Sequence, residues 1–137
     1  MTMRKLLHFD TPREVYQADA VVISCYDARF DAAIRKFLKR RGIVLFDHLK
    51  IAGSVKGLAA EGPDRDFLLR MVRISMGLHH PPRAVLIGHN DCGAYPGLGP
   101  EPITADVVRA AEFLRGAEPG LPADCFFADF DGIYEIP

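Results

Sequence analysis

AVVISC at residues 20–25 and AVLIG at residues 84–88 are the two most apolar stretches of the chain. Both are short and rich in β-branched side chains, a pattern typical of strands that are buried on both faces. Such strands belong to parallel sheets whose two faces are covered by helices. These two stretches therefore predict an α/β protein.

Three segments have the periodicity of amphipathic helices: residues 31–41, 64–78 and 104–115. The first is expected to end at Gly42, and the second stops before Pro81, because a helix rarely continues into a proline. Strands that alternate with helices favour a parallel sheet with right-handed crossovers.

Two further elements are expected in the first third of the chain. Thr11 and Glu14 have the spacing of a capping box, which predicts a short helix before the first strand. Residues 43–46 are apolar and predict a strand, followed by a more polar connection at residues 47–50.

The end of the chain predicts a hairpin. Residues 125–128 and 133–136 read as strands on either side of Asp131-Gly132, a dipeptide typical of tight turns. The predicted fold is a parallel sheet of about four to five strands, mixed at its edge, with helices on both faces. We expect residues 1–137 to form a single domain of this kind.

The composition is ordinary for a globular protein, with a formal net charge of −1. That balance gives no general attraction to nucleic acid or to an anionic membrane. The basic run at residues 35–41 alternates with apolar residues, so we interpret it as the solvated face of a helix. No apolar stretch approaches the ~18 residues of a membrane helix, and residues 1–10 lack a signal-peptide core. We therefore expect a cytoplasmic protein with no nucleic-acid or membrane partner.

The chemically richest segments directly follow the two apolar strands. Cys25 ends the first strand, and His89 and Cys92 follow the second. If these strands are neighbours, three ligands of the types that zinc prefers meet beyond their carboxyl ends. Three ligands leave a tetrahedral zinc ion with one open position, which is the catalytic pattern. Taken alone, either half could instead be a packed histidine or a buried thiol.

Asp27 and Arg29 follow Cys25 at alternate positions. A carboxylate two residues from a ligand on an extended chain faces the same way, and an arginine two residues further on can pair with it through two hydrogen bonds. The alternative is an ordinary ion pair at the end of a strand. The odd number of cysteines, three, argues against a disulfide framework and favours thiolate–metal chemistry.

Cys25-x-Asp27-x-Arg29 followed by His89-x-x-Cys92-Gly93 resembles the paired signature of the β-class carbonic anhydrases. The resemblance covers roughly residues 18–95. It implies that Cys25, His89 and Cys92 bind Zn²⁺, and that Asp27 and Arg29 form a catalytic dyad. In this dyad the carboxylate either accepts a hydrogen bond from water at the zinc or, in an inactive state, occupies the metal itself.

The residues around the motif differ from the family pattern in one turn. Ala52-Gly53 sits where the family has an asparagine–alanine–glycine turn, but it is preceded by Lys50-Ile51 and followed by Ser54. Gly53 and Gly93 are candidates for substrate binding, because a backbone N–H without a neighbouring side chain can approach an oxyanion.

The activity implied by the resemblance is the reversible hydration of CO2 to bicarbonate and a proton, through hydroxide generated at the zinc. Two alternatives stay open: hydrolysis of carbonyl sulfide or carbon disulfide on the same scaffold, and a zinc-binding module with little turnover. The resemblance also implies a homodimer or a dimer-based oligomer. Four residues are candidates for a proton carrier by residue type alone: His48, His79, His80 and Tyr95.

Overall fold

The computed structural model describes residues 1–137 and contains a five-stranded sheet. Its strands are β1 (Ala20–Cys25), β2 (Phe46–Ile51), β3 (Ala84–His89), β4 (Ala123–Asp129) and β5 (Gly132–Ile136). The order across the sheet is β2-β1-β3-β4-β5; the first four strands are parallel and β5 is antiparallel to β4. The predicted α/β class, with a sheet that is mixed only at its edge, is confirmed.

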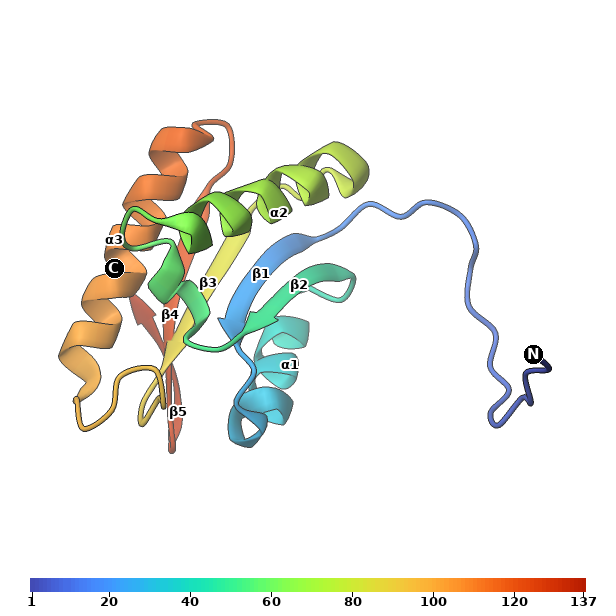
Figure 1. The fold of residues 1–137 in the computed structure, drawn as a ribbon, viewed down its shortest axis with the longest axis horizontal. Helices are drawn as coiled ribbons and strands as arrows, with labels where there is room; N and C mark the ends of the chain where they lie inside the picture. Colours follow the sequence, from blue (N-terminus) through green and yellow to red (C-terminus); the bar gives the residue numbers. More distant parts are fainter.

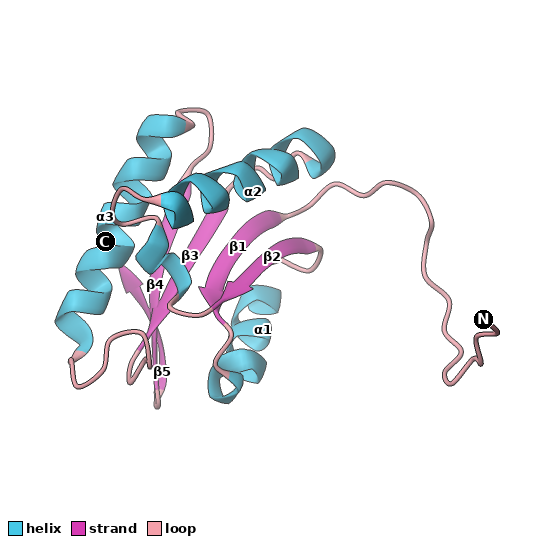
Figure 2. Ribbon diagram, in the orientation of Figure 1, coloured by secondary structure: helices cyan, strands magenta, loops and turns pink.

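Helices cover both faces of this sheet (Figure 1). They are α1 (Asp31–Arg40), α2 (Pro63–His79) and α3 (Pro100–Ala117), with short 3₁₀ turns η1 (Ala28–Phe30) and η2 (Ser54–Gly57). Figure 2 shows α2 and α3 on one side of the sheet and α1 on the other. None of the helices is both long enough and apolar enough to cross a membrane.

The alternation of side chains along the two central strands fills both layers of the core. Val22 and Val85 belong to the same core cluster as Ile34 and Leu38 of α1. Their neighbours along each strand point to the opposite face, so that Ile23 packs with residues of α2 and α3. Every residue of β1 and β3 is buried, as the two apolar runs predicted.

β1 and β3 are hydrogen-bonded neighbours, with Val22 opposite Val85. The chain leaves β1 toward β2 on one side and returns to β3 on the other, so the strand order reverses between β1 and β3. Ligands of open α/β sheets bind beyond the carboxyl ends of the strands at such a reversal. The topology therefore brings the segments after Cys25 and His89 together.

The predicted strand at residues 43–46 is wrong in position. The strand is β2, Phe46–Ile51, which covers the residues expected to form a polar connection. β2 is an edge strand and all six of its residues are only half-buried, so polar residues are tolerated along it. Ile43 is buried in the turn after α1 and does not belong to the strand.

The short helix predicted from Thr11 and Glu14 is also wrong. Residues 1–17 are exposed and contain no helix, and Figure 1 shows this segment extending away from the sheet. A short helix with no apolar face to bury is not stable on capping alone. The segment is attached at Tyr16, whose hydroxyl donates to Asp47 and whose ring stacks on His79 at 3.9 Å between centroids.

Candidate metal centre

Three ligand atoms converge where β1 and β3 end. Cys25 is the last residue of β1, His89 is the last residue of β3, and Cys92 lies in the loop that follows. Their sulfur and nitrogen atoms all lie within 4.8 Å of one another, and all three residues are buried. The structure thus brings together the three residues that the sequence predicted as ligands.

The two strand-end side chains approach the centre from opposite layers. Cys25 packs in a cluster with Ile103 of α3, whereas the ring of His89 lies against Phe30, on the α1 side, at 4.6 Å between centroids. The centre therefore sits beyond the strand ends and between the two helical layers, the crevice where open α/β sheets bind ligands.

The orientation of His89 fits a metal ligand. Its Nδ1 lies 2.7 Å from the carbonyl oxygen of Asn90, so Nδ1 carries the proton and donates. Nε2 then has a free lone pair, and it is the one buried side-chain nitrogen or oxygen without a hydrogen-bond partner. A buried polar atom is rarely left unpaired, and metal-bound histidines usually hold the other ring nitrogen in this way.

The two thiols complete the donor set. Burial raises the pKa of the Cys92 thiol, and the neighbouring Cys25 raises it further. A divalent metal at this place would favour the thiolate form that binds it. Two sulfurs and one imidazole nitrogen are ligands that zinc accepts in tetrahedral geometry.

Asp27 and Arg29 border the centre as a tightly bonded pair. The Arg29 guanidinium donates to both carboxylate oxygens of Asp27, at 2.8 Å from Nη2 and at 3.1 and 3.2 Å from Nε. These bonds hold the pKa of Asp27 at about 2. The carboxylate lies 3.9 Å from Nε2 of His89, so it is ionised and adjacent to the ligands.

A model of the family described as "Putative carbonic anhydrase" matches residues 16–129. The chain belongs to this family of carbonic anhydrases. The match includes both halves of the ligand set and every strand except β5. A comparison with curated protein sequences found no match.

Solved carbonic anhydrases share the fold at low sequence identity. The enzyme from Streptococcus mutans superposes with a TM-score of 0.69 at 16% identity, covering 95% of this chain and 89% of that chain. The β-carbonic anhydrase isoform I from Trichomonas vaginalis gives 0.65 at 13% identity, covering 94% and 87%. One of two tetrameric β-carbonic anhydrases from Sordaria macrospora gives 0.65 at 14% identity, covering 88% and 81%.

The turn that differs from the carbonic anhydrase pattern packs directly on the ligand loop. Gly53 has a positive φ of +77°, and a Cβ at this position would lie 3.0 Å from Cβ of Ala94, two residues after Cys92. Ser54 also has a positive φ, and its buried hydroxyl donates to the carbonyl oxygen of Ile87 at 2.6 Å. This turn therefore ties β3 to the segment that follows β2.

Gly93 is placed differently from Gly53. Nothing lies within 4 Å of the position that a Gly93 Cβ would take. No close contact explains a glycine here, and the space beside the ligand loop is open.

None of the four proton-carrier candidates has a free side chain at the ligands. The ring of His79 is hydrogen-bonded to the carboxylate of Asp47. The backbone carbonyl oxygen of His79 accepts a hydrogen bond from the N–H of Ala18, which precedes β1. His79 and His80 therefore lie at the opposite end of the sheet from the ligands. His48 lies opposite Val22 in the register of β2 and β1, with Nε2 2.6 Å from the Ser24 hydroxyl.

Tyr95 is the candidate that packs beside Cys25 and Cys92. Its hydroxyl donates to Asp106 at 2.7 Å, and burial together with this bond raises the pKa of Tyr95. The Tyr95 ring therefore packs against the cysteines, and its hydroxyl proton is held by Asp106 and is not available to carry protons to or from the site.

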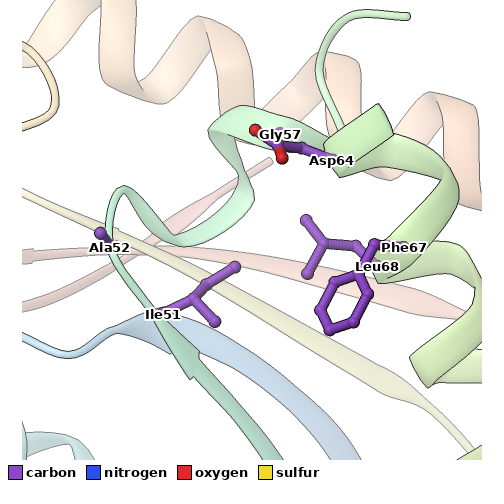
Figure 3. A pocket seen from close by; sticks show the side chains of 6 residues that line it. All are labelled: Ile51, Ala52, Gly57, Asp64, Phe67 and Leu68. Carbon is purple, nitrogen blue, oxygen red and sulfur yellow. The ribbon is translucent and has the colours of Figure 1, made fainter. Parts of the chain in front are cut away.

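A hollow of about 230 Å³ opens one strand away from Cys25. Figure 3 shows Ile51 from β2 facing Phe67 and Leu68 from α2 across it. Ile51 is the register partner of Cys25, but none of Cys25, His89 and Cys92 lines this mostly apolar space.

Sequence reasoning missed three residues that contact this centre. Asn90 bonds Asp129, Asp91 accepts from Arg29 at 3.1 Å, and Phe130 lies against the Arg29 guanidinium. Asn90 and Asp91 stand inside the histidine–cysteine motif, which was their only signal. Phe130 gave no signal, because its contact depends on how the hairpin folds back.

Proposed function

We propose that this protein catalyses the reversible, zinc-dependent hydration of CO2 to bicarbonate and a proton. Cys25, His89 and Cys92 hold the zinc and leave one coordination position open. The observation that carries the proposal is the unpartnered, buried Nε2 of His89, aimed at two buried thiols in a carbonic anhydrase chain. When bound, zinc lowers the pKa of water so that it becomes a nucleophile.

Asp27 and Arg29 act on that water. The ionised Asp27 accepts a hydrogen bond from the water and fixes its orientation. Arg29 occupies both oxygens of the carboxylate and so favours a position beside the ligands over direct binding to the metal. An oriented carboxylate of this kind is an effective partner in proton transfer.

The surroundings suit a small, linear, apolar molecule. Tyr95, Ile103 and Phe127 pack around the two cysteines, and the hollow beside Ile51 is mostly apolar. We assign Gly53 and Gly93 to substrate binding: Gly53 shapes the turn against the ligand loop, and Gly93 leaves space beside it. Backbone N–H groups there serve the oxyanion of bicarbonate.

The proposal includes a homodimer, in which a second copy of the chain packs on α2. Phe67, Ile74 and Leu78 lie on one face of α2 and are each about half exposed. Phe67 also lines the hollow beside Ile51, the register partner of Cys25, so an interface on this face would lie one strand away from the site. An exposed apolar stripe of this kind is typical of subunit contacts.

We place the protein in the cytoplasm. All three cysteines are free and buried, and two of them need to stay reduced to bind metal. A reducing compartment satisfies that need.

The test is CO2 hydration by stopped flow on zinc-loaded protein at mildly alkaline pH. Alkaline pH is chosen because two thiolates neutralise the ion, which leaves its water less acidic than in a three-histidine site. Cys92→Ser is expected to lose zinc and activity. Cys125→Ser is the matched control, because Cys125 is buried in the core opposite Leu86 and is not one of the three converging residues.

Sulfide release from carbonyl sulfide is measured on the same samples. Fast hydration without sulfide release supports the proposal. Sulfide release without hydration favours the sulfur-substrate hydrolase. Stoichiometric zinc with neither activity favours a zinc-binding module.

A further inference from the structure

Arg29 contacts two carboxylates, a backbone carbonyl oxygen and two aromatic rings. Besides the bonds to Asp27, its Nη1 and Nη2 donate to the side chain and the carbonyl oxygen of Asp91 at 3.1 and 3.0 Å. Its guanidinium carbon also lies 5.4 Å from the ring centroid of Phe130 and 5.6 Å from that of Phe30. Two aromatic rings thus border a cation that is itself half exposed.

Phe130 is conspicuous because it is a large apolar side chain in an exposed turn. It is 62% exposed at the tip of the β4–β5 hairpin, where a polar turn residue would ordinarily be found. Its ring packs on Phe30 at 5.3 Å between centroids, and Phe30 in turn packs on His89 at 4.6 Å. The exposed ring is therefore the outer member of a row of three tilted aromatic rings that ends at the proposed ligand His89.

The hairpin tip is fixed relative to the ligand loop. The side-chain amide of Asn90 donates to Asp129 at 3.1 Å, and the same Asp129 oxygen accepts from the N–H of Phe130 at 2.8 Å. The N–H of Asn90 also donates to the carbonyl oxygen of Ala128 at 2.9 Å. Asn90 lies between His89 and Cys92, so these hydrogen bonds fix the position of Phe130 relative to the metal-binding segment.

We propose that Phe130 is a positioning residue, which holds Arg29 in the orientation that grips Asp27. Arg29 is long and half exposed, and its two carboxylate partners compete with water for it. An aromatic face excludes water from one side of the guanidinium and favours the planar orientation. Asp27 then stays beside the ligands. The expected effect of Phe130 on the hydration rate rests on the proposed function, whereas its effect on the orientation of Arg29 does not.

The structural readout is the Nε–Hε cross peak of Arg29 in the NMR spectrum of the zinc-loaded protein, assigned by its loss in Arg29→Lys. In Phe130→Leu, which keeps an apolar side chain but removes the ring, the peak is expected to move toward the shifts of exposed arginines. Phe130→Tyr keeps the ring and is expected to keep the peak. The matched control is Tyr134→Leu, which removes an exposed ring from the same hairpin at a site with no contact to Arg29.

The kinetic readout is CO2 hydration by the wild type, Phe130→Leu, Phe130→Tyr and Tyr134→Leu, with zinc content and Tm measured alongside. The kcat/KM of Phe130→Leu is expected to fall about fivefold, the size of one partly exposed cation–π contact, with one zinc retained. Phe130→Tyr and Tyr134→Leu are expected to remain near wild type.

The two readouts separate two kinds of failure. An Arg29 peak that does not move in Phe130→Leu, or full hydration activity in that variant, overturns the role of Phe130. A wild type that hydrates no CO2 overturns the proposed function, and the cross peak alone then decides whether Phe130 positions Arg29.

Discussion

The carboxylate of Asp27 lies 3.9 Å from Nε2 of His89, yet both of its oxygens are bonded to Arg29. Arg29 therefore holds this negative charge beside the proposed metal ligands. Because Arg29 also bonds Asp91, which precedes Cys92, the pair is anchored to both halves of the ligand set.

Asp27→Asn is expected to keep zinc and lose hydration. Asn is nearly the same size but cannot accept a proton, so kcat/KM should fall about a hundredfold or more. Asp91→Asn is the matched control, because Asp91 bonds the same arginine from a far more exposed position; its effect should be several times smaller. Zinc content and stopped-flow rates measure both. Equal losses in the two variants would mean that Asp27 acts only by holding Arg29.

Gly53→Ala is expected to destabilise the fold and weaken zinc binding. Gly53 and Gly42 share a φ of +77°, but only at Gly53 would a Cβ meet another atom, the Cβ of Ala94 at 3.0 Å. Gly42→Ala should cost about 1 kcal/mol through the left-handed backbone alone. Gly53→Ala should cost about 1–3 kcal/mol more through overpacking. Urea unfolding with zinc affinity measured in parallel tests this; equal costs in the two variants would contradict it.

Stability is expected to fall as the pH drops from about 6.5 to about 4, in part through His48. Burial, with help from the cations Lys50 and Arg35, lowers the pKa of His48 to about 4. In this window the unfolded chain binds a proton at His48 and the folded chain does not, so acidification favours unfolding. His48→Gln should remove on the order of 1–2 kcal/mol of this pH dependence.

The control for this titration is His8→Gln, at an exposed site before β1. Free energies of unfolding are measured at several pH values for all three proteins. A slope in His48→Gln that equals the wild-type slope would contradict the assignment to His48.

Ile74→Glu is expected to break the proposed dimer. Ile74 is 47% exposed at the middle of the apolar stripe on α2. A buried unpaired carboxylate there would oppose association, and sedimentation velocity should show a monomer at micromolar concentrations. Leu98→Glu places the same charge at an equally exposed leucine outside α2 and should leave the dimer intact. A wild type that sediments as a monomer would contradict the dimer itself.

The sequence predicted best those strands that have the same degree of burial along their whole length. β1 and β3 are buried along their whole length, so their composition alone identifies them. β2 was misplaced because an edge strand accepts polar residues such as Asp47 and Lys50, which read as a loop. The helix expected at Thr11 failed because capping cannot replace an apolar partner.

The same distinction holds at the site. The convergence of Cys25, His89 and Cys92 could be predicted, because Cys25 and His89 end the two buried strands and Cys92 follows in the next loop. The adjacency of the two strands brings the three side chains together. Phe130 and Asn90 could not be predicted, because their contacts cross between the hairpin and the ligand loop. Contacts of that kind exist only once the sheet order is fixed.

One zinc ion, held by Cys25, His89 and Cys92, is proposed to make this chain a CO2 hydratase. The most direct test of this proposal is to add zinc stepwise to metal-free protein and to record the stopped-flow rate of CO2 hydration at each step. The rate should rise linearly to one equivalent of zinc per chain and then stay constant. A folded chain that binds one equivalent and hydrates no CO2, or a rate that does not depend on zinc, would contradict it.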